Sequence, residues 1–435
     1  MKYYSTSQKN KFVSFKEAVF KGLADDGGLF MPEKISLLEP SFLDKIDSMS
    51  FQDISFEIAK LFIHEDIPTI VLRNMIDDAL NFDAPLIQLD KHLFVLELFH
   101  GPTLAFKDFG ARMMARLMSY FMSNSDRELT ILVATSGDTG SAVAYGFHRV
   151  EGIRVLILYP SGKISAIQEK QLTTMGGNIT AIEIDGSFDD CQRLVKQAFL
   201  NTELCEQRLL TSANSINIAR LIPQSFYYFY AFAQMKDKHA PCIISVPCGN
   251  FGNLTSGILA KRMGLPVSKF VAATNANDIF PRYLQSGIFK AQPMKPTISN
   301  AMDVGNPSNL VRIKDLYNNN VKKMKWEIFS ASFSDEETKM AIAEIFQEYS
   351  YILDPHGAVG YLGLKQFSSK LVPDKNAIFL ETAHPAKFLD IVQKIVPKNI
   401  EIPERLQKCL SRQKHSIRLS NAFEDLKNFL FSLNY

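Results

Sequence analysis

The stretch TILVATSGDTGSAVA at residues 130–144 contains a short apolar run, a loop rich in glycine and hydroxyl groups, and then small residues typical of a helix. The run at 130–134 has the length and character of a buried strand. Free backbone N–H groups at the start of such a helix bind a carboxylate or a phosphate. A helix entry capped by Thr139 or Ser141 explains the same loop without any ligand.

The alternation of apolar run and longer amphipathic segment continues along the chain from about residue 90. The runs that fit buried strands are 93–99, 130–134, 155–159, 179–184, 242–246, 270–273 and 377–380. The segments that fit intervening helices are 106–121, 141–149, 165–175, 189–200 and 254–263. This pattern predicts an α/β fold with mostly parallel sheets covered by helices on both faces. Ligands in that architecture bind beyond the C-terminal ends of the strands.

The runs fall into two groups, before and after about residue 220, which predicts two α/β lobes. Before them, residues 51–63 place Phe51, Ile54 and Ile58 on one helical face, which is typical of an amphipathic helix. We therefore expect a mostly helical N-terminal extension at 1–88, a smaller α/β lobe at 89–220 and a larger lobe at 221–435 that ends in helices.

Composition excludes several classes of function. Lys plus Arg is 48 and Asp plus Glu is 46, so the formal net charge is +2, too balanced for a surface dedicated to nucleic acid or an anionic membrane. No apolar run reaches the length of about 18 residues that a membrane helix needs, and the polar N-terminus lacks the apolar core of a signal peptide. Neither the five cysteines nor the eight histidines show metal-ligand spacing. We expect a cytoplasmic protein without a metal.

A lysine follows the first predicted strand of the lobes, in the segment HGPTLAFKDFG at residues 100–110. Lys107 lies near the start of the next predicted helix, where the helix dipole and partial burial lower the pKa of an amine. A neutral lysine is a nucleophile that can form a Schiff base. Most lysines are solvated surface groups, so the position beyond a strand and the flanking Phe106 and Phe109 are what distinguish this one.

Two further loops follow predicted strands. CGNFGN at residues 248–253 leads into a helix, and its two glycines allow the backbone to approach a phosphate. It has neither the dinucleotide-binding spacing nor that of a P-loop. Near the C-terminus, ETAHPAK at residues 381–387 places Thr382 at a strand end, where a threonine is usually a structural hydroxyl. Cys248 is better interpreted as a small buried thiol than as a nucleophile.

In this order, these motifs resemble the fold-type II enzymes that use pyridoxal 5′-phosphate (PLP), and more narrowly the threonine synthase family of the long bacterial and fungal type. The matching segments run from about residue 13 to 388. HGPTLAFKDFG and SANSIN (212–217) are specific to the narrower family, and TSGDTG alone indicates the wider one. Other matching segments are GLADDGGLFMP, SVPCGNFGN, TISNAMDVGNPSN, DPHGAVGY and TAHPAKF.

The resemblance implies a role for individual residues. Lys107 matches the lysine that carries PLP and moves protons, and Thr382 matches the hydroxyl that meets the pyridine nitrogen. The segment that matches the cradle for the cofactor phosphate consists of Gly249, Asn250, Phe251, Gly252 and Asn253. The loop that matches the receptor of the substrate carboxylate consists of Ser136, Gly137, Asp138, Thr139 and Gly140. Related enzymes often carry Asn in place of Asp138, whose charge would repel a carboxylate unless the side chain turns away.

The implied reaction converts O-phospho-L-homoserine and water to L-threonine and phosphate. The candidates for binding the substrate phosphate are Lys163, Asn275, Asn277, Arg282 and Asn300. The family also implies a monomer. Two alternatives stay open: a related phospho-lyase that yields a keto acid, and a PLP-binding protein without catalysis. A serine or threonine dehydratase is disfavoured, because its lysine lacks the preceding HGPT.

Overall fold

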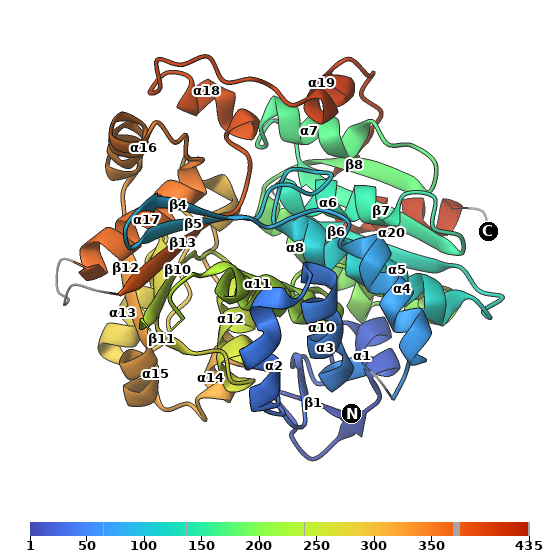
Figure 1. Cartoon of the computed structure of the whole chain (residues 1–435). Helices are drawn as coiled ribbons and strands as arrows, with labels where there is room; N and C mark the ends of the chain where they lie inside the picture. The colour runs from blue at the N-terminus through green and yellow to red at the C-terminus, as the bar shows by residue number, and fades with distance from the viewer. Residues whose placement is uncertain (64, 136, 239, 369–374, 434–435) are drawn as a thin grey trace.

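Two parallel sheets organise the computed structural model, which describes residues 1–63, 65–135, 137–238, 240–368 and 375–433. One sheet has five strands, all parallel, in the order β14-β8-β7-β6-β9. The other has six strands in the order β12-β11-β10-β13-β5-β4, with only β4 antiparallel to its neighbour. Figure 1 shows the six-stranded lobe on the left and the five-stranded lobe on the right. The predicted fold class is confirmed.

The strands and helices have the following bounds. The five-stranded sheet contains β6 (Leu129–Ala134), β7 (Ile153–Pro160), β8 (Ile179–Asp185), β9 (Leu209–Ser212) and β14 (Ile417–Ser420). The six-stranded sheet contains β4 (Leu86–Asp90), β5 (Leu93–Glu97), β10 (Cys242–Pro247), β11 (Val267–Thr274), β12 (Ile328–Ser332) and β13 (Asn376–Glu381). The helices after residue 100 include α5 (Lys107–Met122), α6 (Asp138–Phe147), α7 (Ala166–Thr173), α8 (Phe188–Leu200), α9 (Thr202–Gln207), α10 (Ile218–Leu221), α11 (Phe226–Gln234), α12 (Gly252–Arg262), α13 (Ile279–Ser286), α14 (Leu310–Leu316), α15 (Val321–Glu327), α16 (Asp335–Tyr349), α17 (Pro355–Ser368), α18 (Leu389–Val392), α19 (Glu404–Leu410) and α20 (Phe423–Ser432).

The central strands are buried on both faces, which explains why their sequences are almost uniformly apolar. Every residue of β6 and of β10 is buried. A strand covered by helices on both sides has no polar face, so its sequence reads as a continuous apolar run. This is why all seven predicted strands appear at the expected places. The strands that the sequence did not reveal, β4, β9, β12 and β14, are partly exposed or short.

Strand pairing differs from the predicted grouping at two places. We expected the strand at 93–97 within the lobe formed by residues 89–220, but β5 pairs in parallel with β13 and so belongs to the six-stranded sheet. The strand β14 pairs with β8, so the C-terminal segment returns to the five-stranded lobe. In Figure 1, α18 and α19 cross above both sheets on the way. The boundaries at 88 and 220 themselves stay a prediction.

The passage of the chain from the six-stranded lobe to the five-stranded lobe after β5 positions Lys107. After β5 leaves the six-stranded sheet, the chain enters α5, which packs against α6 of the five-stranded lobe. The residue that begins α5 therefore lies where the two lobes meet. Parallel strands from both sheets end near this junction, as expected for a ligand site in an open α/β fold.

The N-terminal segment is helical with a small sheet. Its helices are α1 (Phe15–Lys21), α2 (Pro40–Lys45), α3 (Phe51–Ile63) and α4 (Thr69–Ala79). The strands β1 (Tyr3–Ser5), β2 (Phe12–Val13) and β3 (Phe30–Pro32) form an antiparallel sheet in the order β2-β1-β3, which the sequence did not reveal. On α3, the predicted apolar face, which includes Phe51, Ile54 and Ile58, is buried.

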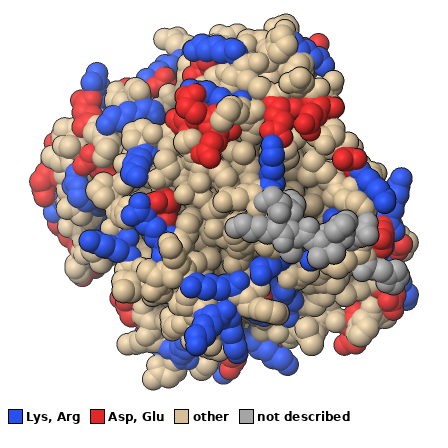
Figure 2. Space-filling view, turned by 90° about the vertical axis from the view of Figure 1, so that its left-hand side faces the viewer, with Lys and Arg blue, Asp and Glu red and all other residues tan. Residues whose placement is uncertain are grey.

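Within the described residues, no helix is both long and apolar enough to cross a bilayer. Basic and acidic side chains are both scattered over the face shown in Figure 2. In the lower part of this face, basic side chains lie together with few acidic ones beside them (Figure 2).

Candidate active site

Lys107 is held beside Thr382 by backbone contacts. The Phe106 N–H donates to the Thr382 carbonyl oxygen at 2.9 Å, and Ala105 forms an isolated antiparallel bridge with Ala383. Lys107 is the first residue of α5. The chain thus joins the predicted nucleophile to the strand-end threonine directly, although they are far apart in sequence.

The environment of Lys107 favours the neutral amine. Burial, which is the largest cause, together with the nearby charges of Lys387 and Arg220, lowers the pKa of Lys107 to about 8. The carboxylate of Asp138 acts in the opposite direction. At neutral pH, a pKa near 8 leaves about a tenth of the amine unprotonated, compared with well under a thousandth for an ordinary lysine. Lys107 is therefore prepared to act as a nucleophile and a base.

One cavity collects most of the predicted site residues. Its lining includes Lys107, Asp138, Thr139, Thr382 and all five residues from Gly249 to Asn253. These residues come from four separate strand ends, as the architecture predicts. Gly137 and Gly140 belong to the same loop as Asp138 but are not among the lining residues. The predicted Ser136 lies outside the described residues.

The loop before α12 contains uncharged groups, and one of its buried N–H donors has no acceptor among the described residues. Phe251, at the N-cap of α12, has the left-handed φ of 61°. The Asn253 Oδ1 accepts hydrogen bonds from the hydroxyls of Tyr227 and Tyr228 at 2.7 and 2.6 Å. Its Nδ2 is buried and has no hydrogen-bond partner among the described residues. A buried unpaired donor at a helix start is costly unless an anion meets it.

Gly249 is confined by the segment across the cavity. A Cβ at this position would lie 2.6 Å from the Met302 Cα and 3.1 Å from the Ala301 carbonyl oxygen. Both contacts are backbone atoms, which cannot swing aside like the end of a flexible side chain. Only glycine therefore lets the two segments approach this closely.

Hydrogen bonds to the Thr135 side chain fix the loop before α6. The Thr135 Oγ1 accepts from the N–H groups of Gly137 and Gly140 at 3.0 and 2.8 Å. Gly137 has a φ of 141°, which a side chain rarely adopts, and a Cβ there would collide with Gln168. The loop geometry is thus set before any ligand arrives.

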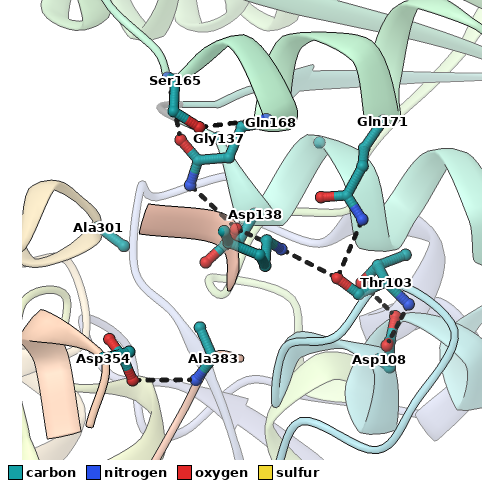
Figure 3. Close-up of polar contacts among 12 residues, drawn as sticks. Thr103, Asp108, Gly137, Asp138, Ser165, Gln168, Gln171, Ala301, Asp354 and Ala383 are labelled. Atoms are coloured by element: carbon teal, nitrogen blue, oxygen red, sulfur yellow. Dashed lines mark hydrogen bonds and ion pairs between the residues drawn. The ribbon is translucent and has the colours of Figure 1, made fainter. Parts of the chain in front are cut away.

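The carboxylate of Asp138 turns toward other protein groups. It forms a buried ion pair with Lys387 at 2.7 Å and accepts from the Gln168 Nε2 at 3.0 Å. Figure 3 shows Asp138 between Gln168 and the segment that contains Thr103. Burial alone would raise the pKa of Asp138, but the charges of Lys387 and Lys107 outweigh it and hold the pKa well below its usual range.

Arg220 is a cation of the cavity that sequence reasoning missed. It is 2% exposed and lines the cavity. Its Nη1 donates to the Ala213 carbonyl oxygen, while its Nε has no partner among the described residues. Burial lowers the pKa of Arg220 to about 10, which still leaves it charged at neutral pH. The residue directly follows SANSINIA in a motif that we used only for the family resemblance.

The candidates for the substrate phosphate are not brought into the cavity. The lining does not include any of Lys163, Asn275, Asn277, Arg282 and Asn300. The Asn275 Nδ2 donates to Asp303 at 2.8 Å, and the largely exposed Arg282 pairs with Asp278 at 2.7 Å. Asn300 is the nearest, since its neighbours Ala301 and Met302 do line the cavity. Amide-rich turns use their side chains to hold their own backbone, and that explanation accounts for Asn275 and Asn277.

Comparisons with known proteins identify the family of this chain. The family model described as "Pyridoxal-phosphate dependent enzyme" matches residues 80–382, "Threonine synthase N terminus" matches 2–80, and "Threonine synthase, C-terminal" matches 357–430. A threonine synthase of Buchnera aphidicola is 44% identical over 99% of each chain.

Solved structures give the same result. The crystal structure of threonine synthase from Escherichia coli has a TM-score of 0.93 and 42% identity, with 99% of each chain covered. That of PLP-bound threonine synthase from Brucella melitensis has a TM-score of 0.92 and 33% identity, over 99% of this chain and 98% of that one. The chain belongs to the threonine synthase family of pyridoxal-phosphate-dependent enzymes.

Proposed function

We propose that this chain is a PLP-dependent carbon–oxygen lyase that converts O-phospho-L-homoserine and water to L-threonine and phosphate, the last step of threonine biosynthesis. The observation that carries the proposal is the cavity in which the low-pKa amine of Lys107 meets Thr382 and two helix starts. Relatives that are 44% identical over nearly the whole chain carry the name threonine synthase.

The residues present fit PLP. The Lys107 amine is the group that would link to the cofactor aldehyde, and Thr382 would meet the ring nitrogen. The segment from Gly249 to Asn253 would hold the phosphate, because it combines the start of α12 with the unpaired Asn253 Nδ2. When bound, PLP supplies the electron sink for charge that develops at the substrate carbons.

The reaction requires repeated proton transfers at neighbouring carbons, and Lys107 is placed to perform them. A base must remove a proton from Cα and later from Cβ, and an acid must return protons to Cγ and Cα. With a pKa of about 8, the Lys107 amine exchanges protons in both directions near neutral pH. Thr382 contributes a hydroxyl without charge, so it would not enforce protonation of the ring nitrogen.

Two anionic groups of the substrate need partners. The backbone N–H groups of Asp138 and Thr139 at the start of α6 suit the carboxylate, whereas those of Gly137 and Gly140 already donate to the Thr135 hydroxyl. Arg220 suits the phosphate, because its guanidinium is buried in the cavity lining and has an unpaired Nε. Lys163, Asn275, Asn277, Arg282 and Asn300 stay a predicted set, and Asn300 has the best position among them.

Measurement of both products tests the proposal. The purified chain with PLP is incubated with O-phospho-L-homoserine, and released phosphate and threonine are quantified together. Equal amounts of both are expected. Phosphate without threonine would instead support the keto-acid-forming phospho-lyase, and bound PLP without either product would support a non-catalytic protein. An Arg220→Met variant should raise KM for the substrate, with a smaller effect on PLP binding.

We also infer that the chain works as a monomer in the cytoplasm. The long type of the family suggests a single chain, and the site described above is assembled from one chain. Sedimentation equilibrium should give a mass near 49.1 kDa. A mass of twice that value would contradict the inference.

A further inference from the structure

The position of Asp138 raises a problem for the proposed reaction. It is the first residue of α6, in the loop proposed to receive a carboxylate, and it lines the cavity. A second carboxylate at that place would repel the substrate, because like charges repel strongly where water is excluded. The structure must therefore neutralise Asp138 or move its charge away.

Lys387 meets this requirement. Its side chain is 0% exposed, and its Nζ lies 2.7 Å from the Asp138 Oδ1. The same Nζ donates to the Thr103 carbonyl oxygen at 2.9 Å. A fully buried lysine is rare unless it is paired. Here the pairing joins two loops of the cavity through one ammonium group.

The contacts of Thr103 connect Lys387 to the Lys107 segment. The Thr103 N–H and Oγ1 donate to the Asp108 carboxylate at 2.8 and 2.7 Å, and Asp108 follows Lys107 in α5. The Gln171 Nε2 from α7 also donates to the Thr103 carbonyl oxygen at 3.1 Å. Figure 3 shows this group of contacts around Thr103. Lys387 thus contacts the loop before Lys107 and the start of α6 from the segment after Thr382.

We propose that Lys387 is a positioning residue for the reaction: its ammonium neutralises Asp138, so that the loop before α6 accepts an anionic substrate, and its charge keeps the Lys107 amine ready to accept a proton. The inference rests on the proposed function, because it assumes the roles of Lys107 and of the loop. It gives a role to Lys387, which the sequence motifs did not single out.

The charges around Lys107 determine whether each variant raises or lowers the pKa of its amine. Asp138 raises the pKa of Lys107, whereas Lys387 and Arg220 lower it. The other titratable groups that line the cavity in the described chain are Cys248 and His356. Lys387 itself faces Asp138 and acts on the Asp108 carboxylate. Removal of Lys387 must therefore raise the pKa of Lys107, and removal of the Asp138 charge must lower it.

The test measures the Lys107 amine in the full-length chain without PLP. The rate of acetylation of Lys107 is followed against pH by mass spectrometry of its peptide. Lys387→Met is expected to raise the midpoint by about 1 pH unit, which slows acetylation at pH 7 about 10-fold. Asp138→Asn is expected to lower the midpoint by a similar amount, and the double variant should lie within about half a unit of the parent chain.

Controls separate charge from misfolding. Lys427→Met removes a lysine of α20 whose partner is Glu203, and it should leave the midpoint unchanged. Circular dichroism must show that each variant is folded. The double variant removes both buried charges together and so remains measurable if Lys387→Met does not fold.

A second readout uses the PLP-loaded enzyme. Lys387→Met should raise KM for O-phospho-L-homoserine about 10-fold, and addition of Asp138→Asn should restore KM to within about threefold. Equal midpoints in all variants, single variants that shift the midpoint in the same direction, or a double variant whose KM is no better than that of Lys387→Met would overturn the proposal. Because acetylation does not depend on turnover, it can support or overturn the role of Lys387 even if the proposed activity is wrong.

Discussion

Two lysines near the cavity, the buried Lys387 and the half-buried Lys107, have opposite surroundings. Lys387 has an anionic partner at 2.7 Å and a carbonyl oxygen at 2.9 Å, so its charge is satisfied inside the protein. Lys107 forms no ion pair among the described residues, and burial lowers its pKa to about 8. The same side chain thus stabilises structure in one place and is made reactive in the other. The difference lies in direct pairing, because the Asp138 carboxylate forms an ion pair with Lys387 but acts on Lys107 only without one.

The sharpest way to test this contrast is to remove the reactive amine. Lys107→Ala should lower the rate of threonine formation about 10⁴-fold, because nucleophile and base are lost together. Its free energy of unfolding should not fall. Activity assays and urea unfolding check the two halves, with Lys427→Ala as the matched lysine variant. Loss of activity only through unfolding would contradict the assigned role.

Removal of Lys387, unlike removal of Lys107, should lower the free energy of unfolding. Lys387→Met leaves the Asp138 carboxylate buried without its cation, so the free energy of unfolding should fall by about 3–5 kcal/mol. Asp138→Asn combined with Lys387→Met should recover most of that loss. Urea unfolding of the three variants gives the comparison. If the double variant were as unstable as Lys387→Met, packing of the lysine stem rather than its charge would be responsible.

The reactive lysine should cost stability in a pH-dependent way. Its folded pKa of about 8 lies below its ordinary value of 10.5, so the unfolded chain binds more protons between these pH values. Stability attributable to Lys107 therefore rises as pH increases from about 8 to 10.5, and the full penalty applies below pH 8. Lys107→Met should be more stable than the parent by at most about 3 kcal/mol at pH 7, less where solvent reaches the side chain.

Unfolding measured at pH 7, 8.5 and 10 would follow this difference. The gap between Lys107→Met and the parent should narrow as pH rises. A gap that is constant with pH would mean that the amine is not destabilised by burial.

The smallest effect concerns the neutral loop across the cavity from the charges. Gly249→Ala places a Cβ against the backbone of Met302, so the dissociation constant of PLP should rise about 10-fold. The acetylation midpoint of Lys107 should not change, because no charge is altered. Gly360→Ala is the matched control, since a Cβ there meets atoms only at 3.4 Å or more and Gly360 does not line the cavity. Fluorescence titration with PLP measures both variants.

Sequence reasoning located the loops that carry Lys107, Asp138, Thr382 and residues 249–253 of the cavity lining, but few of their long-range partners. Lys107, Thr382 and the loop 249–253 were found because each follows an apolar run, and parallel strands end at one edge of a sheet. Arg220 was missed as a lining residue because it lies within a short helix and carries no local sign of burial. Lys387 was missed because nothing near it in sequence shows that Asp138 would face it. Contacts of that kind arise only after the chain folds.

The strands, too, could be located from the sequence, whereas their pairing could not. The runs at 93–99 and 377–380 were recognisable as strands, but their pairing as β5 and β13 depends on how helices pack over the sheets. The sequence by itself determined that the chain is an α/β protein and predicted a reactive lysine and two anion-binding helix starts, because strand burial and loop chemistry are local. Only the tertiary structure decided which lysine is neutralised and which is left reactive, because the charge that controls each amine comes from a distant segment.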